Sequence, residues 1–407
     1  MKKVELLAPA GSLEKLQYAL TYGADAVYIG GKRLGLRASA DNFTIEEMRE
    51  GVEFAHKMGK KVYLTLNIFA HNEDFNGIEE YLKEAQSTGI DAVLISDPGI
   101  LSIVKEVAPN LEIHLSTQSN NTNYRSAAFW HSLGVKRVVL ARELSLEEIR
   151  EIRAKTPSDL DFECFVHGAM CISYSGRCLL SNYMAHRDAN HGECAHACRW
   201  KYQLVEEKRP GEYMPIYEDE RGTYIFNSKD LCMIGHIKEL IEAGISSLKI
   251  EGRMKSAYYV ATVVKAYRDA IDAYFKDPEG YIYDPLYLAE LNKASHREYT
   301  TGFFYSKPGA EDQKYESSSY IREYDFIGVV LEYDKNTGIA KIEQRNRMFK
   351  GDLIEVVNPH GSFFTQTITS MKNENHEEID VAPNAQMIVY IPMEKEVVPY
   401  TILRKEA

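Results

Sequence analysis

Cysteine is concentrated in one segment of this chain. All 6 cysteines fall between positions 164 and 232, and the rest of the 407 residues contain none. The densest group is Cys171, Cys178, Cys194 and Cys198. Disulfide frameworks are typical of short secreted chains, whereas several thiols gathered at one place in a long chain favour a metal centre. The first chemistry that the sequence predicts is therefore thiolate ligation of a metal.

The spacing of the four cysteines distinguishes between metals. They read C-x6-C-x15-C-x3-C, and only the second pair has the short spacing of a structural zinc knuckle. Iron–sulfur clusters accept looser spacing, because four thiolates need only converge on one cluster. We therefore rank a [4Fe–4S] cluster first, zinc second and buried inert thiols third, with Cys232 as an alternative fourth ligand. Cys164 lies within a predicted strand and is expected to pack in the core.

Cations and aromatic side chains are interleaved with these cysteines. Those that we expect to contact RNA are Arg177, Arg187, Arg199 and Trp200. Guanidinium groups pair with phosphates and aromatic rings stack on bases, which favours an RNA-docking surface. The alternative is that these residues offset thiolate charge and pack the segment. The formal net charge of −12 argues against a protein that is basic throughout, so nucleic acid would meet a local patch.

Strands and helices alternate regularly over residues 1–275. Eight short apolar runs, such as "DAVYIG" at 25 and "DAVLIS" at 91, are each followed by an amphipathic helical stretch. Strands that are apolar on both faces and alternate with helices indicate a parallel sheet, and eight units make a closed (β/α)8 TIM-like barrel. A doubly wound open sheet is the alternative. The cysteine-rich insertion occupies about 170–230 of this catalytic domain.

The pattern changes beyond residue 275. We predict a linker over 276–323, which is rich in Tyr, Ser, Lys and Glu. Over 324–407, alternating strands with hairpin signals such as "DKNTG" predict a small antiparallel β-barrel domain. Its stretch "KIEQRNRMFKGD" contains Lys341, Arg345, Arg347 and Lys350, which form a second basic region that could meet RNA.

Polar residues end many of the predicted strands of the barrel. In such barrels the carboxyl ends of the strands meet at one face, where enzymes of this fold place their active sites. The neutral candidates at this face are Asn67, His114, Gln118 and His167. Arg253 and Lys255 follow the last strand, which is a common position for anion binding.

Several motifs together resemble one known family. The stretch "ECFVHGAMCISYSGRCLLS" is similar to the signature of the peptidase U32, or collagenase-like, family. The likeness extends over nearly the whole chain through "LLAPAGSLEKLQYALTYGADAVYIG", "HLSTQSN", "GECAHACRW", "FNSKDL" and "KIEGRMKS". The chain is most similar to the branch of prephenate-dependent tRNA uridine 5-hydroxylases, which has one signature block and a small C-terminal β-domain.

The resemblance implies an activity, a cofactor and a set of ligands. It implies oxygen-independent hydroxylation of the wobble uridine of tRNA to 5-hydroxyuridine, with prephenate as the hydroxyl donor. It also implies a [4Fe–4S] cluster on the four clustered cysteines and, as a further expectation, a partner subunit from the same family. Prephenate has two carboxylates, which guanidinium groups bind well. The predicted substrate-binding residues are Arg33, Arg37, Arg142, Arg253 and Lys255, and the predicted catalytic residues are His167, His114, Gln118 and Asn67.

Two other functions compete with this one, namely a collagenase-like peptidase and a hydroxylase of another substrate such as ribosomal RNA. The chain has no H-E-x-x-H and no G-x-S-x-G motif, although a Cys–His pair such as Cys171 with His167 is compatible with a nucleophile. The first residues lack the apolar run of a signal peptide, and no apolar window is long enough to span a membrane. We therefore expect a cytoplasmic protein with no membrane partner.

Overall fold

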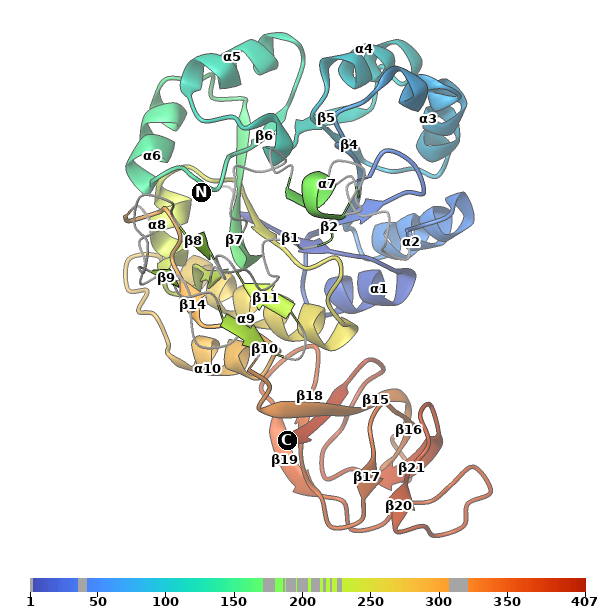
Figure 1. Ribbon diagram of the computed structural model, residues 1–407. Coiled ribbons are helices and arrows are strands. Elements are labelled where there is room, and N and C mark those ends of the chain that lie inside the picture. Colours follow the sequence, from blue (N-terminus) through green and yellow to red (C-terminus); the bar gives the residue numbers. More distant parts are fainter. Residues whose placement is uncertain are drawn as a thin grey trace.

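The computed structural model contains a closed barrel of eight parallel strands (Figure 1). It describes residues 3–35, 42–170, 180–185, 187, 195, 204–205, 213–214, 217–219, 222–224, 229–306 and 321–407. The barrel strands are β1 (Glu5–Pro9), β2 (Ala26–Gly30), β3 (Lys61–Leu66), β4 (Ala92–Ile95), β5 (Glu112–Leu115), β6 (Arg137–Val139), β7 (Asp161–Ala169) and β13 (Ser247–Ile250). Because β13 pairs in parallel with both β1 and β7, the ring closes. The predicted (β/α)8 barrel is confirmed, and the open doubly wound sheet is excluded.

Helices surround the barrel and explain why its strands are apolar on both faces. They are α1 (Leu13–Thr21), α2 (Ile45–Lys57), α3 (Ile78–Ser87), α4 (Pro98–Val107), α5 (Tyr124–Ser132), α6 (Leu146–Ala154), α8 (Ile237–Glu242) and α9 (Ala257–Lys276). Short 3-10 turns lie at η1 (Asn72–Phe75), η2 (Thr117–Ser119) and η4 (Ile234–His236). Ser12 caps the N-terminus of α1 and Thr44 caps that of α2, the latter in a capping box with Glu47. Within the described ranges, no helix has the length and apolarity that crossing a membrane requires.

The regular alternation is interrupted after β7. The short elements that follow are α7 (Leu180–Ala185), β8 (Leu204–Val205), β9 (Tyr213–Met214), β10 (Tyr217–Asp219), β11 (Gly222–Tyr224) and β12 (Asp230–Cys232). Strand β12 pairs antiparallel with the end of β7, and β14 (Tyr299–Thr300) pairs with β12. Helix α10 (Leu286–Asn292) contacts α9. The range predicted as a linker, 276–323, therefore contributes a helix and a strand that pack on the barrel.

The C-terminal residues form a curled antiparallel sheet, as predicted. Its strands are β15 (Tyr324–Asp334), β16 (Ile339–Gln344), β18 (Leu353–Val357), β19 (Phe364–Thr367), β21 (Ile388–Pro392) and β22 (Ile402–Glu406), with a separate pair β17 (Met348–Phe349) and β20 (Val381–Ala382). The predicted "DKNTG" turn joins β15 to β16, where Gly338 N donates to Asp334 O at 2.8 Å. This sheet encloses its own apolar core.

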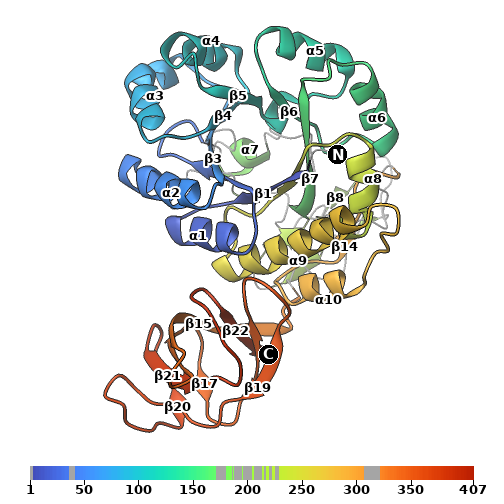
Figure 2. The same cartoon turned by 180° about the vertical axis from the view of Figure 1, so that it is seen from behind.

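Figure 2 shows the C-terminal domain beside α9 and α10, and charged and hydroxyl groups join the two domains on this side. Arg404 of β22 is 1% exposed, and it donates to Glu290 of α10 and to Glu355 of β18, each at 2.7 Å. Lys293, after α10, also binds Glu355, at 2.9 Å. Tyr22, after α1, donates its hydroxyl towards Val357 O in β18 at 2.9 Å. We call these contacts the domain interface.

Candidate active site at the carboxyl end of the barrel

The carboxyl ends of the strands face the viewer in Figure 1. There α1 to α6 follow one another anticlockwise, as they do when right-handed βαβ units are seen from that end. Helix α7 lies in front of the barrel centre in Figure 1 and behind it in Figure 2, so it lies over this opening, which we call the mouth.

Two predicted residues, Asn67 and Gln118, lie together with neighbouring serines at the mouth. Asn67 follows β3, and its Nδ2 donates to Ser116 Oγ, after β5, at 3.1 Å. Ser96, after β4, donates to Asn67 O at 3.2 Å. Asn67 Oδ1 and Gln118 Oε1 are buried and accept no hydrogen bond from the described residues. Both are therefore acceptors that a ligand N–H or O–H group could satisfy.

Arg253 lies in the wall of the mouth, and its side chain reaches β3, the strand that Asn67 follows. It follows β13 and is 4% exposed, with Nη1 donating to Thr65 Oγ1 and Nη2 to Asn42 Oδ1, each at 3.0 Å. A Cβ on Gly30, at the end of β2, would lie 2.5 Å from this guanidinium. Only glycine therefore leaves room for Arg253 at this height of the barrel.

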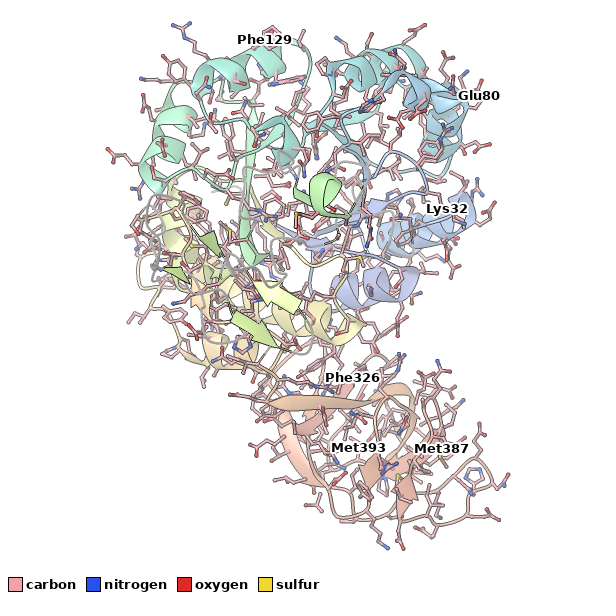
Figure 3. The ribbon with its side chains drawn as sticks, viewed as in Figure 1. Lys32, Glu80, Phe129, Phe326, Met387 and Met393 are labelled. Atoms are coloured by element: carbon pink, nitrogen blue, oxygen red, sulfur yellow. The ribbon has the colours of Figure 1, made fainter. Side chains whose placement is uncertain are left out.

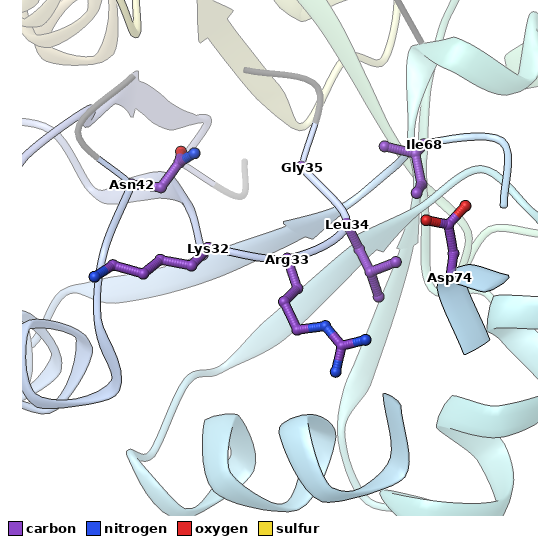
Figure 4. A pocket seen from close by; sticks show the side chains of 8 residues that line it. Lys32, Arg33, Leu34, Gly35, Asn42, Ile68 and Asp74 are labelled. Atoms are coloured by element: carbon purple, nitrogen blue, oxygen red, sulfur yellow. The ribbon is translucent and has the colours of Figure 1, made fainter. Parts of the chain in front are cut away.

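A pocket of ≈ 270 Å³ opens beside Arg253 (Figure 4). This mouth pocket is lined by Gly31, Lys32, Arg33, Leu34, Gly35, Asn42, Ile68 and Asp74. Asn42 belongs both to its lining and to the partners of Arg253, so the pocket and the arginine form one continuous site. The guanidinium of Arg33 donates to the carbonyls of Gly77, at 2.9 Å, and Asn76, before α3.

Arg142 has a different role from Arg253. Its Nη1 donates to Ala169 O at 2.8 Å and its Nη2 binds Glu251 Oε2 at 3.2 Å, while the guanidinium lies 3.9 Å from the centre of the Phe165 ring. These contacts join the carboxyl end of β7 to the loop after β13. Lys255, in the same loop, places Nζ 5.0 Å from the centre of the Tyr259 ring.

His167 lies in a cage of tyrosines near the end of β7. It is 1% exposed, and the rings of Tyr259, Tyr267 and Tyr299 have their centres 6.0, 5.6 and 5.5 Å from its own. Its Nδ1 has no hydrogen-bond partner in the part of the chain that the structure describes. Burial, together with the charge of Lys255, lowers the pKa of His167 to about 3. The imidazole is therefore neutral at physiological pH.

His114 lies deeper in the barrel than the mouth residues. It is fully buried, and its Nε2 donates to Glu112 Oε1 at 2.8 Å. Burial lowers the pKa of His114, so the neutral ring keeps Nδ1 as an acceptor, for which the described residues provide no donor. Because His114 and Ser116 are two residues apart, they share one face of this chain segment. His114 therefore lies one layer beneath the Asn67–Ser116 pair.

A buried layer of charged side chains fills the amino-terminal half of the barrel. Arg137 Nη1 binds Glu5 Oε1 at 2.5 Å and Glu163 Oε2 at 3.3 Å, and Lys249 Nζ binds Glu163 Oε1 at 2.7 Å. Burial opposes ionisation of Glu163, yet the charges of Lys249 and Arg137 lower its pKa overall. Tyr63 donates its hydroxyl to Glu5 at 2.7 Å. We call this group the buried charge layer, and it supports the mouth from below.

Several residues predicted to bind metal, substrate or RNA lie outside the described residues. Outside the described residues lie Cys171, Cys178, Cys194, Cys198, Arg37, Arg177, Arg199 and Trp200. Arg187 is described and exposed, and its backbone N–H donates to Ser181 O at 3.4 Å. Cys164 and Cys232 are both buried free thiols, and burial raises the pKa of Cys232 to about 11. Cys232 lies directly across from His167 in the β7–β12 pair.

One hydrogen bond links the two parts of the cysteine-rich segment. Ala195 N donates to the Ser181 hydroxyl at 2.9 Å, and Ser181 is buried in α7. Ala195 directly follows Cys194, and Ser181 comes three residues after Cys178. Sequence neighbours of two predicted ligands therefore lie side by side at the mouth.

Sequence reasoning missed several residues around these groups. It did not identify Asn42, Thr65 or the tyrosine cage of His167. A signal for part of the cage was present, because Tyr259 and Tyr267 are eight residues apart on α9 and therefore share a helix face. No comparable pattern joins Asn42 to Arg253, which are far apart in the chain.

Comparison with known proteins gives matches over both domains. Residues 11–314 match the model of peptidase family U32, and residues 322–404 match that of the peptidase family U32 C-terminal domain. The chain is 48% identical to tRNA hydroxylation protein P1 of Bacillus subtilis, over 99% of this chain and 95% of that one. It is 39% identical to tRNA hydroxylation protein P of Escherichia coli, over 97% of this chain and 95% of that one. It is also 41% identical to an uncharacterized protease of Methanocaldococcus jannaschii, over 95% of each chain.

The two domain matches run in the same order as the barrel and the C-terminal sheet, and the similarity to these relatives covers nearly their whole length. The chain therefore belongs to peptidase family U32.

Proposed function

We propose that this protein is an RNA-modifying enzyme that hydroxylates the wobble uridine of tRNA to 5-hydroxyuridine. The observation that carries the proposal is the similarity, at 48% identity and nearly full length, to a relative named for tRNA hydroxylation. The mouth supports it, because acceptors on Asn67 and Gln118 lie in the same opening as Arg253. Such acceptors suit the N–H group of a uracil ring.

The proposal includes prephenate as the hydroxyl donor, bound in the mouth pocket. Prephenate is a dicarboxylate, and Lys32, Arg33 and Arg253 bring three cations to the pocket or its wall. Arg253 is the main carboxylate-binding residue in this arrangement, because it is already desolvated and fixed in position, which reduces the cost of ordering it on binding. Arg142 acts by positioning the end of β7.

We expect Arg253→Gln to weaken equilibrium binding of prephenate by about 1.5–3 kcal/mol, the usual value of a charged hydrogen bond. Arg153→Gln is a matched control, because the Arg153 guanidinium is likewise held by uncharged oxygens, but these are the backbone carbonyls of Leu160 and Pro157, before β7 and away from the mouth. Isothermal titration calorimetry on the folded variants measures both. Equal affinity of the wild type and Arg253→Gln for prephenate would contradict this placement.

The proposal also includes a [4Fe–4S] cluster on Cys171, Cys178, Cys194 and Cys198, with Cys232 as the alternative fourth ligand. Four thiolates are the donor set that such a cluster takes, and the Ser181–Ala195 hydrogen bond supports convergence of the chain around two of them. A bound cluster supplies one-electron redox chemistry. The residues of the mouth would bind and orient the substrates, and α7 would help to exclude water from them.

Mass spectrometry of nucleosides tests the function directly. Cells that lack the gene should lose 5-hydroxyuridine and its derivatives from tRNA, and expression of this chain alone should restore them. Restoration only with a second family member would identify the partner subunit that the proposal includes. If 5-hydroxyuridine in tRNA is unchanged while a hydroxylated nucleoside disappears from ribosomal RNA, the substrate is ribosomal RNA instead.

Peptidase activity is the second candidate, because the family and the Methanocaldococcus jannaschii relative are named for it. The two cysteines within the described ranges do not favour it, since both thiols are buried and burial raises the pKa of each. Gelatin cleavage by the purified wild type, abolished by Cys171→Ser and accompanied by unchanged RNA nucleosides, would establish the peptidase and overturn the hydroxylase.

A further inference from the structure

A second pocket lies on the C-terminal domain, away from the mouth. It has a volume of ≈ 350 Å³, within the usual range of small-ligand sites of about 300–1,000 Å³. We call it the junction pocket, and it is lined by Gln344, Arg345, Asn346, Arg347, Pro383 and Ala385. Its lining comes from the end of β16 and from the chain after β20, so the curled sheet itself forms it.

The junction pocket is next to the barrel on the same side as the mouth. Arg345 Nη2 binds Glu14 Oε1 at 2.6 Å, and Glu14 lies in the first turn of α1, which follows the carboxyl end of β1. Three residues earlier, Gly11 approaches the backbone of Arg253 so closely that a Cβ would lie 2.2 Å from Arg253 O. The short segment 11–14 therefore runs from the wall of the mouth to the junction pocket.

Figure 3 allows both places to be found. Lys32, which is labelled, marks the mouth pocket. Met387, also labelled, marks the junction pocket, because its carbonyl accepts from Gln344 N at 2.9 Å.

Two side chains that line the junction pocket have a group without a partner among the described residues. Gln344 is 2% exposed, and its Nε2 donates to Ala382 O at 3.1 Å, while its Oε1 accepts nothing from the described residues. The Ala382 contact fixes which side-chain atom is the acceptor. Arg347 is exposed, and within the described ranges its guanidinium has no acidic partner. By contrast, the neighbouring Lys341 binds Glu332 at 3.0 Å and Arg345 binds Glu14.

An unsatisfied acceptor beside an unneutralised guanidinium, with proline and alanine completing the wall, matches the chemistry of a nucleotide. Every nucleobase carries an N–H donor for Gln344 Oε1, its flat face can lie on apolar side chains, and its phosphate can pair with Arg347. The acidic side chain of a peptide would satisfy Arg347, but it would not itself carry a flat ring with an N–H donor.

We propose that the junction pocket binds one nucleotide of the RNA substrate away from the reacting base, with its phosphate on Arg347 and its base on Gln344. The inference rests on the proposed function and adds a contact that lies outside the mouth. The position beside segment 11–14 allows a single RNA loop to reach both pockets. Since all bases carry an N–H donor, this contact should raise the affinity for RNA and fix its position on the protein, and it should discriminate little between RNA sequences.

The test measures binding of unmodified total tRNA to the full chain by fluorescence anisotropy at several salt concentrations. Arg347→Ala should weaken binding by about tenfold, as expected for loss of a charged hydrogen bond, and should reduce the slope of log K against log salt by about one. Lys335→Ala is the matched control, since Lys335 is a cation of the same domain that pairs with Glu396 and lies outside the second basic region, so its loss should leave both quantities unchanged. Arg347→Lys should retain the salt slope and lose only part of the affinity.

The outcomes separate this inference from the proposed function. If the wild type binds tRNA and Arg347→Ala binds as tightly as Lys335→Ala, the junction pocket is not an RNA site, although RNA hydroxylation can still be correct. If the wild type does not bind tRNA and nucleosides are unchanged in the gene deletion, both fail. Normal tRNA binding by Arg347→Ala, with loss of a co-purifying polypeptide, would instead assign the pocket to a protein partner and overturn the inference.

Discussion

Replacing Cys194 with serine should yield a colourless protein without iron. Wild-type protein purified without oxygen should be brown, with an absorption shoulder near about 400 nm from thiolate-to-iron charge transfer that dithionite bleaches. Serine removes the soft thiolate that the cluster needs, so the variant should contain little iron. Iron and sulfide analysis together with absorption spectra measure the result.

Cys164→Ser provides a matched control for this experiment, because the same atom is changed in a thiol buried within β7. It should retain iron. A parallel comparison of Cys198→Ser with Cys232→Ser identifies the fourth ligand, since only the true ligand should be needed for a stable cluster. Colourless wild-type protein with stoichiometric zinc would contradict the iron assignment and favour a structural zinc site.

Replacing Arg137 with methionine should destabilise the barrel by about 3–5 kcal/mol, the usual cost of removing one partner of a buried ion pair. Arg137 is the contact shared by Glu5 and Glu163, and Glu163 is completely enclosed. Without the guanidinium, the Glu163 carboxylate would keep the Lys249 ammonium and the Ser247 hydroxyl as partners and would lose one of its two cations. Urea denaturation followed by circular dichroism gives the free energy of unfolding.

Lys155→Met is the control for the Arg137 variant. Lys155 also pairs with a glutamate, Glu151, but on the exposed surface of α6 and its end, where water screens the interaction. Loss of this pair should leave the urea concentration at the midpoint of unfolding the same as in the wild type. Should Arg137→Met unfold at the same urea concentration as Lys155→Met, the buried charge layer would not be a source of stability.

The barrel could be predicted from the sequence because its signals are local. Each strand is a short apolar run and several helices begin at a capping side chain, as at Ser12 and Thr44, so eight repeats could be counted without knowing any contact. The packing of 286–300 could not be predicted in this way. Strand β14 is only two residues long and is defined by its pairing with β12, which is a long-range contact.

The candidate site was only partly predictable for a similar reason. Strand ends identified Asn67, Gln118 and Arg253, since the fold itself brings these positions to one face. Depth within the barrel is not a property of local sequence, so nothing distinguished His114, beneath the mouth, from Ser116 above it. The second basic region also has fewer unpaired cations than its sequence indicated, because Arg345 forms an ion pair with Glu14 of the barrel domain.

The domain interface has a geometric consequence. Val329, Val357 and Ile402 pack against the apolar core of the barrel, and the interface adds directional hydrogen bonds and ion pairs on Arg404, Lys293 and Tyr22. Such directional contacts fix the angle between the domains more sharply than apolar packing alone does. Hinge bending between the barrel and the C-terminal sheet would have to break several of them at once. The two domains therefore keep one relative orientation. A ligand that contacts the barrel and the C-terminal sheet together must match the fixed distance between its two contact sites. Whether it binds therefore depends on how far the ligand can bend, and not on closure of the protein.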